Sequence, residues 1–129
     1  MTRKIKLPPP CFDFLHAELL SAENGKAVVR FVPTEQMENP YGTIQGGIIA
    51  GMLDNVFGPA VVSAAPSSRS TTVQMSVNYL RSVKAGEPII GTAEVVKLGR
   101  TQVLIEAKME RESDRELLVK ATATNLIRE

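Results

Sequence analysis

Asp54 is the first candidate for chemistry in this sequence, because it is the only acidic or basic side chain within residues 41–68. A surface helix normally carries a charged stripe opposite its apolar face, and this stretch has none. A lone carboxylate in such surroundings is costly unless it is paired or used, which suggests a general base or a nucleophile. The alternative is that Asp54 merely faces water or caps a neighbouring loop.

The second candidate is the glycine pair Gly46 and Gly47, which follows Gln45 at the start of the same stretch. Glycine is a poor residue for starting a helix, but it leaves backbone N–H groups sterically open. At the positive end of a helix dipole, such groups stabilise a carbonyl oxygen that gains negative charge. The alternative is a glycine-rich turn that lets a helix and a strand pack closely.

The composition argues against several other kinds of site. The chain has 129 residues, which fits one domain, and a formal net charge of +1, which argues against broad binding to nucleic acid or to an anionic membrane. The single cysteine, Cys11, excludes an internal disulfide, and the single histidine, His16, excludes a multi-histidine zinc site. We expect His16 to be partly buried and structural, and we expect no metal and no cofactor. With no targeting segment evident, we expect a cytoplasmic protein.

Residues 46–64 are predicted to form one central helix, kinked at Pro59. Its apolar face, read at helical spacing, consists of Ile48, Met52, Leu53, Val56 and Ala60. Around Asp54 the side chains are small, namely those of Ala50, Gly51 and Gly58. This small face predicts close approach of a ligand or of a partner chain, with the sheet covering the other side.

The remaining segments read mainly as β-structure. Residues 12–20 are strand or short helix, 23–26 a turn, 27–32 a strand and 34–38 a short helical turn. Long strands are predicted at residues 71–80, 88–98, 101–109 and 116–126, joined as a meander of three hairpin-like connections. In the first of them, Val73, Met75, Val77 and Tyr79 alternate with Thr72, Gln74, Ser76 and Asn78 on the opposite face.

These elements predict an α+β domain in which a curved antiparallel sheet wraps around the one long helix. The predicted domain covers residues 12–129. Residues 1–11 are predicted to be an N-terminal arm, because three consecutive prolines, Pro8 to Pro10, favour an extended chain.

Taken together, these segments resemble the hotdog-fold acyl-CoA thioesterases of the phenylacetic-acid-degradation (PaaI-like) type, over residues 12–126. The resemblance is carried by Asn39-Pro-Tyr-Gly42, Gln45-Gly46-Gly47, Asp54 and the strand Thr72-Val-Gln-Met-Ser-Val-Asn-Tyr-Leu-Arg81. It implies that the Gly46 N–H polarises the thioester carbonyl and that Asp54 is the general base or nucleophile. It also implies that Asn39 lies at the thioester and that Thr72 positions the water.

The resemblance further implies a homodimer, in which the carboxylate of one chain faces the glycine of the other, and pairing of dimers into a tetramer. One residue departs from the pattern: the family has histidine where this chain has Gln45. Glutamine can still form hydrogen bonds, but it cannot carry a proton at neutral pH. We expect the substitution to alter the rate and the substrate class rather than the reaction itself.

The implied substrate is a small aryl- or acyl-CoA, with coenzyme A entering only as part of that substrate. Candidates for binding it are Gly47 and the basic residues at strand ends or turns, namely Arg81, Lys84, Lys97 and Arg100. Met37, Phe57 and Met75 could line an acyl pocket or belong to the core. The alternative function is a hotdog module that binds acyl-CoA or another small ligand without turnover, a hypothesis favoured by Gln45. No nucleic-acid or membrane partner is expected.

Overall fold

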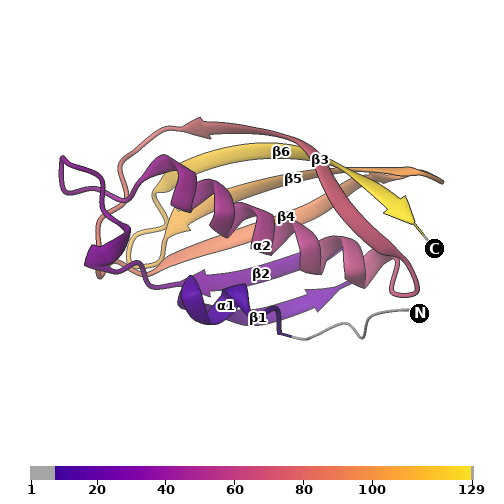
Figure 1. The fold of residues 1–129 in the computed structure, drawn as a ribbon, viewed down its shortest axis with the longest axis horizontal. Helices are drawn as coiled ribbons and strands as arrows, with labels where there is room; N and C mark the ends of the chain where they lie inside the picture. Colours follow the sequence, from indigo (N-terminus) through magenta and orange to yellow (C-terminus); the bar gives the residue numbers. More distant parts are fainter. Residues whose placement is uncertain (1–7, 129) are drawn as a thin grey trace.

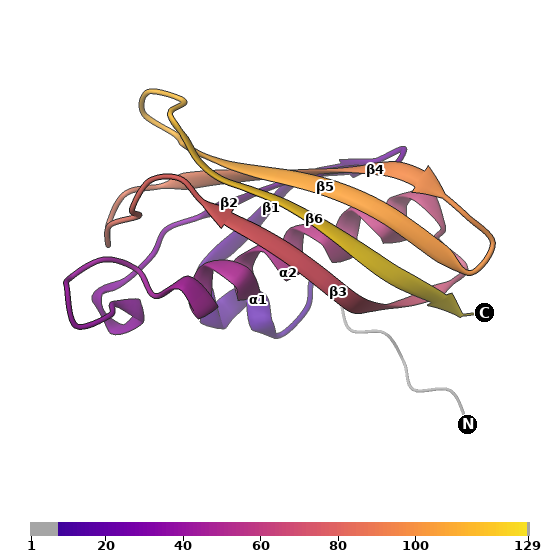
Figure 2. The ribbon, with the colours of Figure 1, turned by 90° about the horizontal axis from the view of Figure 1, so that it is seen from above.

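The computed structural model describes residues 8–128 and shows a six-stranded antiparallel sheet that curves around one long helix (Figures 1 and 2). The strands are β1 (Ala17–Glu23), β2 (Lys26–Phe31), β3 (Arg69–Tyr79), β4 (Ile89–Leu98), β5 (Gln102–Arg111) and β6 (Leu117–Arg128). The helices are α1 (Cys11–Phe14), the short 3-10 turn η1 (Glu35–Met37) and the central helix α2 (Gly46–Ala64). The expected α+β arrangement is confirmed.

The strand order, β1-β2-β4-β5-β6-β3, differs from the predicted meander. Strands β4, β5 and β6 follow one another as hairpins, but β3 does not pair with β4. Instead β3 pairs with β6, and β2 occupies the free edge of β4, with Lys26 opposite Glu94. The connection between β3 and β4 is a crossing loop rather than a tight turn, and the Val83 carbonyl in it accepts a hydrogen bond from the Ile44 N–H before α2. Strand β3 is therefore an edge strand.

Residues 12–20 were predicted to be either a strand or a short helix, and the structure has both there, the short helix α1 followed by strand β1. The helix begins at Cys11, the last residue of the predicted arm, and Pro10 before it has helical backbone angles rather than extended ones. Residues 1–7 of the predicted arm lie outside the described residues. His16 was expected to be partly buried, which is wrong: it is exposed at the turn into β1, with φ of 52°.

Helix α2 begins at Gly46 and ends at Ala64, as predicted, and continues through Pro59. Its length and apolar composition would also allow a membrane span, a test that the core helix of a soluble protein passes as well. Here one side of the helix packs against the concave face of the sheet, where its buried residues are Ile49, Met52, Leu53, Val56, Phe57, Ala60 and Val61. Phe57 and Met37 belong to this core, and Met75 packs against it half-buried.

Two close contacts fix the helix against the sheet. At Gly91 in β4, an added Cβ would lie 2.9 Å from a methyl group of Val56, so only glycine allows this approach. At the other end, the Ser63 hydroxyl accepts a 2.9 Å hydrogen bond from the N–H of Gly25, whose φ is +81° in the β1–β2 turn. These two contacts hold α2 against β4 and against the β1–β2 turn.

A β-bulge in β3 overturns the predicted alternation of that strand. The register with β6 shifts between Thr72 and Gln74, so Val73 is an extra residue. Val73 is consequently 55% exposed rather than on the same side as Val77, and Thr72 is half-buried. The bulge turns Thr72 toward the helix, whereas regular alternation predicts it on the opposite face of the strand from Met75 and Val77.

Candidate active site

Asp54 and Thr72 form the central polar contact of the helix–sheet junction. The Thr72 hydroxyl donates a hydrogen bond of 2.6 Å to Oδ1 of Asp54. Asp54 itself is exposed on α2, on the side away from the core residues Leu53 and Val56. One carboxylate oxygen is thus held by the strand, while the other is open toward solvent or a ligand, which is the arrangement that a general base or nucleophile requires.

The start of α2 presents open backbone donors. Gln45 is the N-cap residue, and no side chain caps the helix. The N–H groups of Gly46 and Gly47 have no backbone partner within residues 8–128, and an added Cβ at Gly47 would meet no atom within 4 Å. The side chain of Gln45 is exposed. These donors lie at the positive end of the helix dipole, where an oxyanion is stabilised.

Asn39 organises the loop that leads into the helix. Its Oδ1 accepts hydrogen bonds from the N–H groups of Tyr41 at 2.9 Å and Thr43 at 3.2 Å. Its Nδ2 donates to the Thr43 hydroxyl at 2.9 Å. Its amide is thus engaged within the loop itself, so in this structure Asn39 acts first by shaping the approach to Gln45. Its expected contact with a thioester stays a prediction.

A hollow of about 290 Å³ adjoins the helix start. Its walls are formed by residues that precede and open α2 and by the end of β3 with the loop after it, namely Thr43, Ile44, Gly46, Ile49, Tyr79, Leu80, Arg81, Ser82 and Val83. Tyr79 was not among the predicted site residues. The sequence does place it on the correct face, however, because Tyr79 alternates in step with Met75 and Val77, which point toward the helix.

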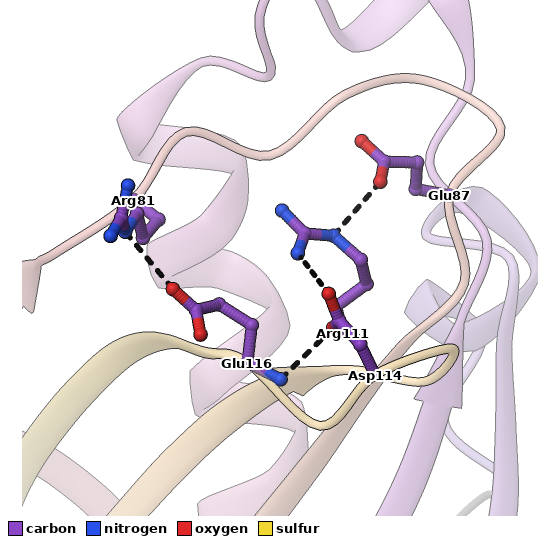
Figure 3. Close-up of polar contacts among 5 residues, drawn as sticks. All are labelled: Arg81, Glu87, Arg111, Asp114 and Glu116. Atoms are coloured by element: carbon purple, nitrogen blue, oxygen red, sulfur yellow. Dashed lines mark hydrogen bonds and ion pairs between the residues drawn. The ribbon is translucent and has the colours of Figure 1, made fainter.

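The predicted phosphate-binding residues divide between the two ends of the molecule. Arg81 lies at the hollow and forms an ion pair of 3.1 Å with Glu116, while a neighbouring cluster links Arg111 to Glu87 and Asp114 (Figure 3). Lys84 is exposed in the same loop as Arg81.

Arg100 and Lys97 lie elsewhere, because they belong to the β4–β5 hairpin near the C-terminal end of α2 (Figure 1). The structure therefore brings Arg81, and not Arg100, close to Gly46 within one chain.

A larger hollow of about 430 Å³ lies on the outer face of the sheet. Its lining residues are Leu20, Lys26, Val28, Ile90, Thr92, Lys108, Glu112 and Arg115. The sheet separates it from Asp54 and Gly46, and Arg30 and Glu112 at its edge pair with each other at 2.7 Å. It contains none of the predicted catalytic residues, so the smaller hollow is the better candidate site.

Comparison with known proteins shows which proteins this chain resembles. Residues 41–118 match the sequence profile of the Thioesterase superfamily. The human protein acyl-coenzyme A thioesterase 13 is 28% identical over 106 residues, which cover 82% of this chain and 76% of that protein. A hypothetical thioesterase from Streptococcus pneumoniae, solved with coenzyme A, is 26% identical, with a TM-score of 0.81 and coverage of 86% of this chain and 87% of that one.

The fold is also that of the Escherichia coli PaaI protein from the phenylacetic acid degradation operon. That structure superimposes with a TM-score of 0.87, covering 95% of this chain and 86% of that one, at 21% identity.

Proposed function

Because this chain belongs to the thioesterase superfamily and is a thioester hydrolase of the hotdog fold, we propose that it hydrolyses a small aryl- or acyl-CoA with Asp54 and Gly46 as the reacting centre. The observation that carries the assignment is the Thr72–Asp54 hydrogen bond of 2.6 Å, which fixes an otherwise isolated carboxylate. The open N–H groups of Gly46 and Gly47 provide the complementary donors.

The reacting centre is proposed to form between two copies of the chain. Asp54 follows Gly46 by eight residues on one helix, a separation of about 12 Å at the helical rise per residue. One thioester carbonyl cannot contact both groups over that distance. Two antiparallel copies of α2 would instead bring Asp54 of one chain to Gly46 of the other, and the open space at Gly51 and Gly58 permits the approach.

The proposed chemistry is addition of water to the carbonyl carbon. The Asp54 carboxylate takes a proton from water as the oxygen attacks, and the carbonyl oxygen accepts hydrogen bonds from the backbone at Gly46. The C–S bond then breaks, and coenzyme A leaves as a thiolate that takes up a proton from solvent. Gln45 supplies no proton at neutral pH, so departure of the thiolate has to proceed without an acid at this position.

A nucleophilic role for Asp54 is the competing route, in which a mixed anhydride forms and is then hydrolysed. A single turnover in H₂¹⁸O tests the anhydride route. Label in the Asp54 side chain would establish that route, because water would then have attacked the Asp54 carbonyl carbon, whereas direct attack by water on the thioester labels the carboxylic acid product alone.

The proposed substrate class follows from the hollow beside Gly46. Ile44, Ile49 and Val83 give it an apolar wall, and its volume of about 290 Å³ suits a small acyl or aryl group. Arg81 lines the hollow and Lys84 follows in the same loop; both are exposed and are the proposed partners for the phosphates of coenzyme A.

The function is tested by thiol release from a panel of acyl-CoA thioesters with wild type and Asp54→Asn. The variant keeps the size of the side chain and removes its charge, so kcat should fall at least about a hundredfold while binding persists. Glu106→Gln, an equivalent change at an exposed carboxylate on β5, is the matched control and should leave kcat unchanged. Unaltered turnover per folded Asp54→Asn protein would refute the role of Asp54. Tight binding of acyl-CoA by wild type without any thiol release would identify a binding module.

A further inference from the structure

Tyr79 holds the first residue of the central helix. Its hydroxyl donates a hydrogen bond of 2.7 Å to the Gly46 carbonyl. Its ring also packs against the glycine, because an added Cβ on Gly46 would lie 3.3 Å from both Cζ and Oη of Tyr79. A strand residue 33 positions away in sequence thus clamps Gly46 from the side.

Such a clamp matters because the helix start is otherwise weakly constrained. Two successive glycines have more conformational freedom than any other pair of residues, and no side chain caps this terminus. A backbone donor stabilises an oxyanion only if its direction is set before the reaction. The hydrogen bond from Tyr79 fixes the peptide group that joins Gly46 to Gly47.

The same hydrogen bond also affects the donor strength of that peptide. Hydrogen bonds polarise one another along a chain, so a donor at the Gly46 carbonyl makes the N–H of the same peptide a better donor. That N–H belongs to Gly47. It lies at the open terminus of the helix, where it has no backbone partner among the described residues.

The strand holds Tyr79 firmly in this place. After the bulge at Val73, Tyr79 faces the helix, and the next two N–H groups, of Leu80 and Arg81, both donate to the Leu118 carbonyl at 2.9 and 3.1 Å. Tyr79 is nevertheless 49% exposed and lines the hollow of about 290 Å³. It can therefore hold Gly46 while part of its surface remains accessible to a ligand.

We propose that Tyr79 is a positioning residue for thioester hydrolysis, which orients and polarises the Gly46–Gly47 peptide, whose N–H is one of the two open donors proposed for the carbonyl oxygen, beside the N–H of Gly46. This inference rests on the proposed function. In this proposal Tyr79 does not take part in bond breaking or proton transfer and acts only through the backbone of Gly46.

The test is Tyr79→Phe, which removes the hydroxyl and keeps the ring. Loss of one hydrogen bond that acts in the transition state should lower kcat about five- to tenfold, with KM and the calorimetric affinity for coenzyme A unchanged. Tyr41→Phe is the matched control at the only other tyrosine of the chain. The Tyr41 side chain is 89% exposed, so the Tyr41→Phe variant should have the same kcat as wild type.

A second readout reports on the peptide directly. In Tyr79→Phe, the amide proton resonance of Gly47 should move upfield, because its peptide loses a polarising hydrogen bond, whereas Tyr41→Phe should leave it in place. A variant with lower thermal stability but unchanged kcat and Gly47 resonance would show a merely structural tyrosine and overturn this inference alone. A wild type that hydrolyses no acyl-CoA would overturn the proposed function and this inference with it.

Discussion

The hydrogen bond between Thr72 and Asp54 depends on a single extra residue in β3. Met75 and Val77 point toward the helix. Without the bulge, regular alternation would turn Val73 toward the helix as well, and Thr72 would face away from it. The bulge reverses this alternation for the residues before it. The carboxylate of Asp54 gains a fixed partner at 2.6 Å as a result.

Replacing Thr72 with valine tests this contact. Valine has the same shape and lacks the hydroxyl, so Asp54 would lose its anchor while the strand stays intact. We expect kcat to fall about tenfold or more, the range for a hydrogen bond to a charged group. Thr71→Val is the matched control, because Thr71 is exposed and points to the other face of β3. Equal kcat values for the two variants would show that Asp54 does not need Thr72.

The hairpin turn between β5 and β6 contains two carboxylates whose pKa values lie below their ordinary values, those of Glu112 and Asp114. The backbone N–H of Glu116 at 3.0 Å and the Arg111 guanidinium at 2.9 Å lower the pKa of Asp114 (Figure 3). Arg30 likewise lowers the pKa of Glu112 in the same turn. Lowered carboxylate pKa values stabilise the folded state above the unfolded-state value of about 4, and this stabilisation is lost as pH falls through the folded-state pKa.

We therefore expect Asp114→Asn to flatten the acid side of the stability curve. The variant has no carboxylate to protonate at this position, so its Tm should fall less than that of wild type below about pH 4. The difference is small, because Asp114 is exposed and its charge is screened by solvent. Thermal unfolding at several pH values measures it. Parallel curves for the two proteins would mean that the turn does not contribute to acid sensitivity.

At the scale of the whole molecule, residues 8–128 present two surfaces beside the proposed reacting centre that a second copy could contact. Strand β3 is an edge of the sheet, and unpaired strand edges readily accept another strand. The exposed side of α2 has one charge, Asp54, and open space at Gly51 and Gly58. Both surfaces adjoin the reacting centre, which is proposed to be completed by a second chain.

We expect wild type to sediment as a dimer or larger at micromolar concentration, with no detectable monomer. Gly58→Leu places a bulky side chain on the small face of the helix. Leucine is a good helix former, so the chain should still fold but should become monomeric and lose hydrolysis. Ser113→Leu adds the same side chain in the exposed β5–β6 turn and should still associate and still hydrolyse acyl-CoA. A stable wild-type monomer that hydrolyses acyl-CoA would contradict the shared site.

The sequence by itself determined the elements whose signals are local. Helix α2 begins and ends where the glycine pair and the serine- and proline-containing turn predict. The β1–β2 turn forms at Asn24 and Gly25, which both adopt positive φ. The sequence likewise singles out Asp54 and Gly46 as candidates, because a lone charge and a glycine pair in an apolar helix are visible without a fold, and their roles stay predictions.

Tertiary structure alone decided how these parts meet. Strand β3 pairs with β6 rather than β4, and it has a bulge at Val73. Both features depend on contacts between segments that are distant in the sequence, and the hydrophobic periodicity of one segment does not contain that information. The same contacts place Tyr79 on Gly46 and leave the β4–β5 hairpin, which contains Arg100, at the far end of α2 (Figure 1). Local propensity sets which residues form a helix or a strand, whereas the partner of each strand is chosen by which packing buries the whole apolar face of α2.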